Sequence, residues 1–226
     1  MRLQRDLHLF PMSPVTHFFA GWILASAFPA GSPTSLTRRE KILVVGAAVA
    51  PDLDGAGIVP ELPTRNSSHP LLWFSEYHHM LHTLAFATAC ALIAFLVAGP
   101  LAGFAFGPVI QGRRSPTHPW LTALLVFVSF HLHLLCDLVG ARGPDGYQWP
   151  IPYLRPFSSA LQLSWHGQWF LNGWQNFLIT AILLATSLWI GWKYASSPLE
   201  LVSVSANQAF VRTLRRRLSP NTGGAE

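Results

Sequence analysis

The fold is decided by the stretch WLTALLVFVSFHLHLLCDLV, residues 120–139. It is apolar over almost all of its twenty residues, which is the length that an α-helix needs to cross a hydrocarbon layer of roughly 30 Å. Its second half nevertheless carries His133 and Asp137. A polar side chain at membrane depth is costly and tends to mark function, because only a partner such as a metal ion offsets its desolvation. We therefore expect a membrane helix that contributes to a metal site.

Four other apolar segments lie along the chain, at residues 14–28, 42–59, 81–106 and 174–194. Hydrophobic residues make up 50% of the sequence and charged residues only 11%, which is too apolar for an ordinary soluble domain. Several tryptophans stand where an apolar segment meets a polar loop, as at bilayer interfaces: Trp120, Trp149, Trp174 and Trp192. The sequence predicts an all-α integral membrane helical bundle of about five apolar segments. The first two are short or interrupted by glycine, so one of them could be re-entrant or tilted.

The basic residues fit a membrane topology better than a nucleic-acid footprint, although the formal net charge is +5. Most stand in small groups beside apolar segments, so we expect the lipid bilayer as partner and no direct nucleic-acid binding. Basic loops tend to stay in the cytoplasm. Three groups obey this rule together if the chain crosses the membrane five times with its N-terminus outside: Arg38, Arg39 and Lys41; Arg113 and Arg114; Lys193 with Arg212 and Arg215 to Arg217.

This topology describes a multi-pass protein of the plasma membrane with a cytoplasmic C-terminus. It puts every ligand-type residue at the outer end of its segment: His17, Asp52, Asp54, His78, His79, His82, His133 and Asp137. We divide the chain into an N-terminal extension (1–13), a membrane-embedded domain (14–194) and a basic polar tail (195–226) with an amphipathic stretch. The true start is Met1 or Met12. A cleaved signal peptide is an alternative interpretation of the first segment, and its cleavage would remove His17.

Two aspartates follow the second apolar segment in the sequence Pro51-Asp52-Leu53-Asp54-Gly55. The proline and the glycine favour the end of a helix at this point. Carboxylates two residues apart in non-helical backbone can both reach one ion or can bridge two. The alternative interpretation is a helix-end turn with solvated acids.

Histidines open the third apolar segment in the pattern His78-His79-x-x-His82. On a helix His78 and His82 share one face, and His79 and His82 nearly do, so two of these imidazoles can hold one metal ion. His133 and Asp137 are also four residues apart, although a buried His–Asp pair can be purely structural.

His131 points to another side of that helix, about 200° away from His133 at roughly 3.6 residues per turn. We therefore expect it to be a packing residue or to support a ligand. His17 stands alone near the start of the first segment, where a lone histidine is by itself a weak signal.

The ordered set of these motifs resembles the bacterial family of membrane-bound metal-dependent hydrolases, which includes inner-membrane proteins described as LexA-binding. The resemblance runs from about residue 16 to residue 157. It is carried by Thr16-His17, Pro51-Asp52-Leu53-Asp54, His78-His79-x-x-His82-Thr83, His133-x-x-x-Asp137 and Gly146…Trp149-Pro150. The order of ligands is also similar to that of zinc-dependent phospholipases C, which favours phosphoesters. Many members have an arginine in the histidine motif that is missing here, which leaves open whether His78 or His79 is the first ligand.

The resemblance implies an inner-membrane protein with a divalent metal site and hydrolytic activity. The expected metal ligands are His17, Asp52, Asp54, His79, His82, His133 and Asp137. They suit one or two divalent ions, zinc in the first place, with manganese or iron as alternatives. Such an ion would activate a water molecule toward an ester or phosphoester, and His78 is the candidate that moves the proton. The sequence does not indicate the substrate.

Two other functions compete with hydrolysis. Membrane di-iron oxygenases cluster histidines in a similar way, but the paired acids fit such a site poorly. A non-enzymatic metal-binding or transport protein is the third possibility, or a protein that recruits a soluble partner through its basic tail. A transporter would be expected to carry its ligands near mid-span rather than toward one face.

Overall fold

The computed structural model describes residues 14–28, 32, 34–64, 66–72, 79–99, 101, 117–143 and 146–218. Within these residues the secondary structure is helical, apart from isolated bridges between Arg142 and Phe170 and between Ile151 and Leu163. The α-helices are α1 (Pro14–Ser26), α2 (Arg38–Val49), α3 (Ile58–Thr64), α5 (Leu84–Ala98), α6 (Pro119–Gly140), α7 (Trp174–Tyr194) and α8 (Val204–Leu218), and the 3₁₀ helices are η1 (Pro51–Gly57) and η2 (Pro198–Leu201). The predicted all-α class is confirmed.

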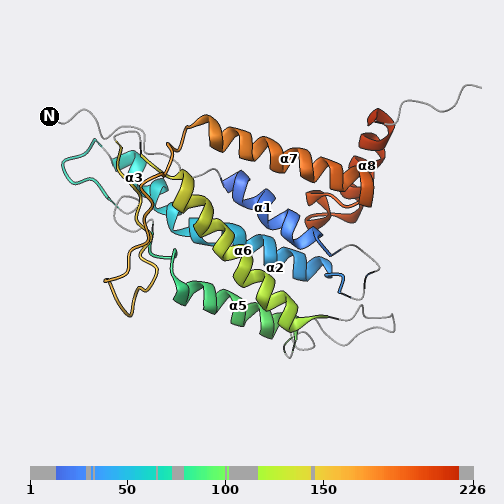
Figure 1. Ribbon diagram of the computed structural model, residues 1–226, viewed down its shortest axis with the longest axis horizontal. Helices are drawn as coiled ribbons and strands as arrows, with labels where there is room; N and C mark the ends of the chain where they lie inside the picture. Colours follow the sequence, from blue (N-terminus) through green and yellow to red (C-terminus); the bar gives the residue numbers. More distant parts are fainter. Residues whose placement is uncertain are drawn as a thin grey trace, which may run out of the picture.

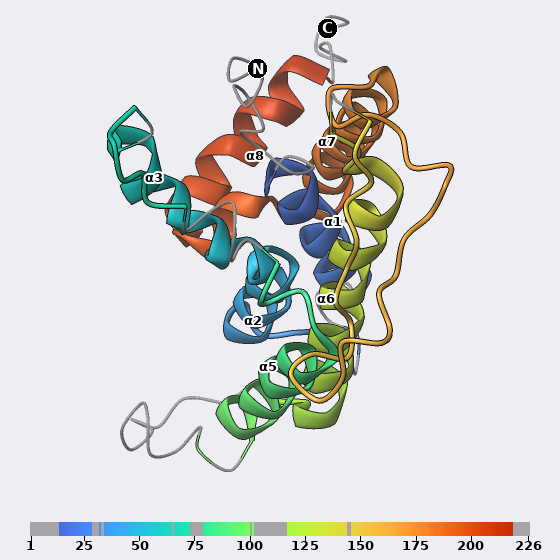
Figure 2. The ribbon, with the colours of Figure 1, turned by 90° about the vertical axis from the view of Figure 1, so that its left-hand side faces the viewer.

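The helices α1, α2, α5, α6 and α7 form an elongated bundle, in which α6 crosses one side of α1 and α2 (Figures 1 and 2). α6 packs against α1, α2 and α5, and α1 packs against α2 and α7. Successive long helices alternate in direction, so the bundle has two distinct ends. One end carries α3 and the loop residues 141–143 and 146–173, and we call it the α3 end. The opposite end carries η2 and α8, and we call it the α8 end (Figure 1).

Two of the helices, α6 and α7, are long and apolar enough to cross a membrane. A third span results if α2 and the segment Pro51–Thr64 are one span broken by a bend of 55°. The bend has a local cause, because Pro51 lacks a backbone N–H and its ring clashes with the preceding turn, which ends α2. With 13 and 15 residues, α1 and α5 are shorter than the roughly 20 residues of a full span. By length and composition, two or three of the five predicted segments are therefore candidate membrane spans.

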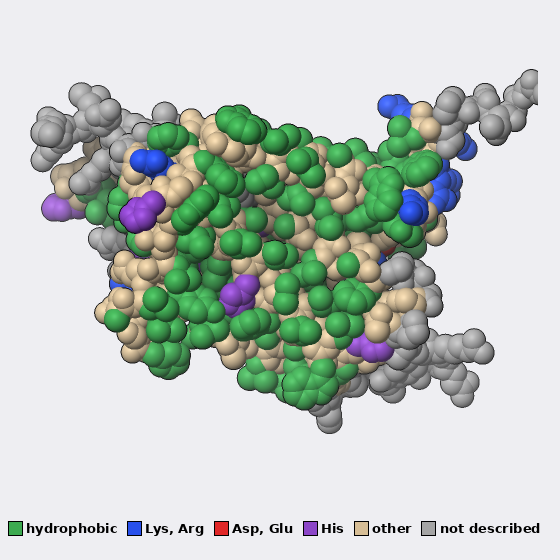
Figure 3. Space-filling model, in the orientation of Figure 1, with side chains coloured by type: hydrophobic (Ala, Val, Ile, Leu, Met, Phe, Trp, Pro, Cys, Tyr) green, Lys and Arg blue, Asp and Glu red, His purple; other side chains and the backbone are tan. Residues whose placement is uncertain are grey.

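The surface between the two ends is suited to a bilayer. α7 exposes most of its apolar side chains, including Trp174, Phe177 and Ile182, which would be an extended apolar patch in water. Hydrophobic side chains cover most of the face seen in Figure 3, whereas Lys and Arg gather on α8. The bundle is therefore a membrane protein with its charge displaced toward its ends.

The helices α1, α2 and α6 approach one another through small residues. A Cβ atom built on Gly21 would lie only 2.5 Å from the Cβ of Ala48 and 3.2 Å from the Oγ of Ser129. The Ser129 hydroxyl donates a hydrogen bond to the Val44 carbonyl. Trp22, which is fully buried, fills the space beside this contact. Close approach at small residues is how membrane helices gain packing energy without a hydrophobic driving force between them.

We predict that Gly21→Ala destabilises the protein by about 1–3 kcal/mol, because the new methyl group has no room and α1 must move away from α2. Gly46→Ala is the matched control, since a Cβ at Gly46 meets nothing within 4 Å. Thermal unfolding of both variants in mild detergent measures the difference. Equal melting temperatures for the two variants would mean that the α1–α2 contact is wrongly placed.

Candidate metal centre

Four segments that are distant in sequence bring ligand-type side chains to the α3 end. His17 lies in the first turns of α1, Asp52 and Asp54 lie in η1, and His82 lies two residues before the start of α5. The last turns of α6 add His133 and Asp137. In Figure 1 the corresponding ends of α1, α2, α5 and α6 point toward α3. The expected convergence of these ligand-type residues at one end is therefore observed.

The carboxylate of Asp137 is the centre of this cluster. Its Oδ1 lies 3.3 Å from Nε2 of His17. Its Oδ2 lies 3.0 Å from Nε2 of His133 and 3.3 Å from Nε2 of His82. The side chain of Asp137 is only 2% exposed. Three imidazoles from three segments thus face one buried carboxylate.

The two aspartates of η1 lie beside this centre, and each faces a different histidine. Oδ1 of Asp52 lies 3.7 Å from Nε2 of His133. Oδ2 of Asp54 lies 3.5 Å from Nδ1 of His82 and accepts a hydrogen bond from the backbone N–H of Leu81. Because the 3₁₀ turn that begins at Pro51 ends the regular helix, both acids can face the cluster although they are two residues apart.

Several buried polar atoms of the cluster make no hydrogen bond within the described part of the chain. They are both ring nitrogens of His17, both carboxylate oxygens of Asp52, and Oδ1 of Asp137. A buried polar atom without a partner is costly. A cation bound among these atoms would satisfy the carboxylate oxygens and one ring nitrogen of His17, so the residues present fit a divalent metal ion.

His17, Asp52, His133 and Asp137 can hold such an ion. Each offers one ligand atom, and these atoms lie within 4.8 Å of one another. Nε2 of His82 lies 3.3 Å from Nε2 of His133, so His82 adjoins the same group. Imidazole nitrogens and carboxylate oxygens suit zinc, manganese and iron, and the donor set does not choose among them.

The ring of His133 is held in the orientation that a metal ligand requires. Its Nδ1 lies 2.8 Å from the carbonyl oxygen of Ala48. A carbonyl oxygen only accepts, so Nδ1 donates this hydrogen bond and Nε2 is the ring nitrogen that faces the cluster. The ring of His17 stacks on the ring of His133 with centroids 3.8 Å apart. The backbone of α2 therefore orients the ring of a candidate ligand on α6.

The described part of the loop after α6 contacts the end of that helix. Gln168 is buried and donates from Nε2 to the carbonyl of Asp137, and its Oε1 accepts from the backbone N–H of Trp149. Trp149 in turn contacts His79, with ring centroids 5.9 Å apart. The stretch of the loop that includes Trp149 thus lies at the α3 end.

The structure separates the predicted ligands into two groups. Six of them meet in the cluster: His17, Asp52, Asp54, His82, His133 and Asp137. His79 contacts Trp149, and its role as a ligand stays a prediction. His78 lies outside the described residues. Sequence reasoning missed Gln168 and the carbonyl of Ala48, because neither a loop glutamine nor a backbone carbonyl carries a spacing pattern.

His131 faces away from the cluster, as predicted. Its Nδ1 bonds the carbonyl of Phe127 and its Nε2 bonds the hydroxyl of Tyr153. The carbonyl of Tyr153 accepts from the backbone N–H of Leu84. His131 and Tyr153 therefore connect α6 to the start of α5, two residues after His82.

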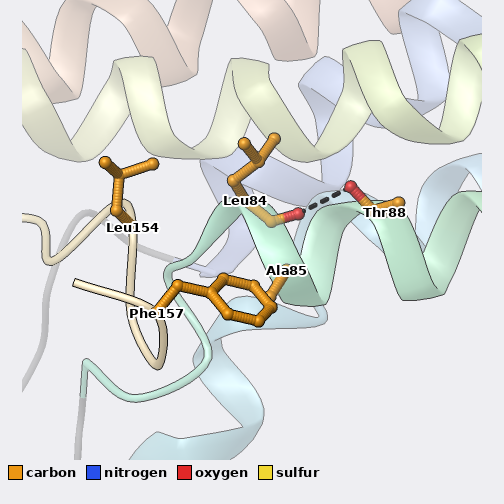
Figure 4. A pocket seen from close by; sticks show the side chains of 5 residues that line it. All are labelled: Leu84, Ala85, Thr88, Leu154 and Phe157. Atoms are coloured by element: carbon orange, nitrogen blue, oxygen red, sulfur yellow. Dashed lines mark hydrogen bonds between the residues drawn. The ribbon is translucent and has the colours of Figure 1, made fainter.

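An apolar cavity of about 300 Å³ lies on the flank of this region (Figure 4). It is lined by Leu84, Ala85, Thr88, Leu154 and Phe157. Its one hydroxyl, that of Thr88, donates to the carbonyl of Leu84 within the same helix. The cavity thus offers hydrocarbon surface close in sequence to His82, and none of the six clustered residues lines it.

Comparison with known proteins gives one family match. A sequence model of the family described as YdjM inner membrane protein matches residues 12–213. No curated protein and no solved structure matches the chain. The matched range contains the six clustered residues and ends within α8.

We predict that His133→Ala removes most of the bound metal from the purified protein, because the loss of one ligand leaves an incomplete site. His131→Ala is the matched control, since it removes an imidazole two residues away whose nitrogens face other partners. Elemental analysis of protein purified in mild detergent measures the metal content of each. Equal metal content in the two variants, or loss in His131→Ala alone, would contradict the assigned centre.

Proposed function

The chain belongs to the YdjM inner membrane protein family, and we propose that it is a metal-dependent hydrolase of the bacterial inner membrane. The observation that carries the proposal is the buried Asp137 carboxylate, which three imidazoles face at 3.0–3.3 Å. Two further carboxylates stand beside it, on Asp52 and Asp54. Clusters of imidazoles and carboxylates are typical of hydrolytic metal sites.

The arrangement supports one or two divalent ions. Oδ1 of Asp137 faces His17, whereas Oδ2 faces His82 and His133, so both oxygens of this carboxylate would be available to hold metal. Asp52 stands beside His133, and Asp54 stands beside His82. We propose zinc as the resident ion, with manganese or iron as alternatives.

A divalent ion in such a site lowers the pKa of a bound water molecule and polarises a scissile ester or phosphoester bond. Other groups of the chain orient the side chains that would hold the ion. His133 is fixed by the carbonyl of Ala48. Asp54 accepts from the N–H of Leu81 and faces Nδ1 of His82, which orients the His82 ring. His78 is proposed to move the proton.

A non-enzymatic metal-binding role is the second candidate, and the burial of the cluster favours it. The side chains of His17 and His133 are 0% exposed. An ion held so deeply would join the segments of α1, α2, α5 and α6 and stabilise the bundle whether or not a substrate reaches it. If the protein has this non-enzymatic role, its basic C-terminal tail recruits a soluble partner.

We propose that the chain crosses the membrane five times, with the metal centre toward the outer face and the C-terminus in the cytoplasm. Support comes from the separation of charge along the bundle. The metal cluster lies at the α3 end, while Arg38, Lys193 and the arginines of α8 lie at the α8 end (Figures 1 and 3). Basic groups favour the cytoplasmic side.

We predict that Asp54→Asn lowers hydrolysis by at least tenfold while the protein stays folded, because the amide keeps the shape of the side chain and loses the charge that faces His82. A panel of phosphoesters, carboxylic esters and amides provides the activity assay, and thermal unfolding measures stability. His118→Ala, at the start of α6 and at the α8 end, is the control.

Two outcomes of this assay would count against the hydrolase. Wild-type turnover in metal-loaded Asp54→Asn would remove the carboxylate from the mechanism. Bound metal without turnover on any substrate, combined with a lower melting temperature after chelation, would favour the binding protein.

We predict that an impermeant thiol reagent labels Ser67→Cys in intact cells and leaves Gln208→Cys unlabelled until the membrane is opened. Both positions are exposed, and they lie beyond α3 and on α8 respectively. The background protein has Cys90 and Cys136 replaced by alanine. The reverse pattern of labelling would invert the proposed orientation.

A further inference from the structure

The last helix, α8, lies across the end of the bundle. In Figure 1 it stands crosswise to α7, and in the view turned by 90° it is seen along its length beyond the ends of the other helices (Figure 2). When α6 and α7 cross the membrane, a helix in this orientation runs parallel to the membrane surface. This is the orientation of helices that lie in the headgroup layer.

One face of α8 is fixed to the bundle. Asn207 is buried, accepts at Oδ1 from the backbone N–H and the hydroxyl of Ser197, and donates from Nδ2 to the carbonyl of Ala195. Leu214 packs over Gly191 of α7. Arg215 donates to the carbonyls of Trp192 and Lys193 at the end of α7. The helix is therefore a docked element with a defined outward face.

The outward face carries uncompensated positive charge. Arg212, Arg216 and Arg217 are exposed, and their side chains make no ion pair or hydrogen bond with the described part of the chain. α8 contains no acidic residue. Among the described residues the acid nearest in sequence is Glu200, which is engaged by Lys41 and Ser196. Several guanidinium groups within two turns repel one another, and they are stabilised when anions lie between them.

Aromatic side chains mark the same level of the bundle as a membrane interface. The last turns of α7 hold Trp189, Trp192 and Tyr194, which are 39–47% exposed. The ammonium group of Lys193 lies 4.8 Å from the ring centroid of Trp189 and 5.3 Å from that of Tyr194. Aromatic rings and basic side chains gather at this depth because the rings are amphipathic and the cations reach phosphate.

We infer that α8 lies in the headgroup layer of the membrane and that Arg212, Arg216 and Arg217 bind the phosphates of anionic phospholipids. Three observations support this partner: the orientation of α8 across the bundle, the unpaired arginine side chains, and the exposed aromatic side chains at the end of α7. Guanidinium groups match phosphate oxygens in both charge and geometry. The site lies at the opposite end of the bundle from the metal cluster, so it is independent of the proposed hydrolysis.

Lipid binding by the full-length protein in a neutral maltoside detergent tests this assignment. Native mass spectrometry during titration with phosphatidylglycerol or phosphatidylcholine gives the two affinities. Each arginine near an anionic surface contributes about fivefold, so replacing all three by glutamine should weaken phosphatidylglycerol binding by roughly a hundredfold. Phosphatidylcholine binding should stay unchanged, and replacement of all three by lysine should keep most of the preference.

Arg155→Gln, an exposed arginine at the α3 end, is the control and should leave lipid binding unchanged. If the triple glutamine variant does not fold, the wild-type protein still tests the assignment. Its phosphatidylglycerol affinity should fall several-fold between low and high salt. Equal affinity for the two lipids, an unchanged preference in the folded triple variant, or tighter binding of an oligonucleotide or acidic peptide would overturn the assignment.

Discussion

The Asp137 carboxylate is almost completely buried and lies 3.0–3.3 Å from imidazoles of three separate segments. In an apolar bundle the cost of desolvating this charge must be offset by polar or cationic groups in direct contact with it. The positions of α1, α6 and the residues before α5 all follow from that requirement. The break in α2 at Pro51 meets it as well, because it brings the paired acids of η1 to the same point. The small residues between α1, α2 and α6 let the backbones approach closely enough for His133 to reach the carbonyl of Ala48.

The alternating direction of the helices separates two chemistries along the bundle. Every element that ends or begins with a candidate ligand does so at the α3 end, and the docked η2 and α8 carry basic charge at the other end. Polar contacts hold that second end together as well. Buried Glu40 accepts from the backbone of His118 and the hydroxyl of Thr122, which joins the start of α2 to the start of α6. The apolar length between the ends is the part suited to hydrocarbon.

The sequence was sufficient to predict the two long helices and the meeting of the ligands. A continuous apolar run defines α6 and α7, and an antiparallel chain must bring alternate segment ends together. It was not sufficient for the lengths of α1 and α5, because helix ends depend on caps and on tertiary contacts that hydropathy does not contain. It also could not describe the backbone around His82, since the histidine spacing suggested a helix, whereas residues 79–83 are not helical and His82 faces Asp137 from this irregular segment. The support from Gln168 arises from an irregular loop without any repeating pattern.

X-ray absorption at the metal edge of the purified protein tests the metal centre around Asp137, because it reports the atoms around the ion. A centre of imidazoles and carboxylates predicts a first shell of nitrogen and oxygen at about 2.0–2.2 Å for zinc, with the outer-shell scattering of two or three imidazoles. That scattering should weaken in His133→Ala and stay unchanged in His131→Ala. A protein without stoichiometric metal, or a first shell that contains sulfur or lacks imidazole, would contradict the account.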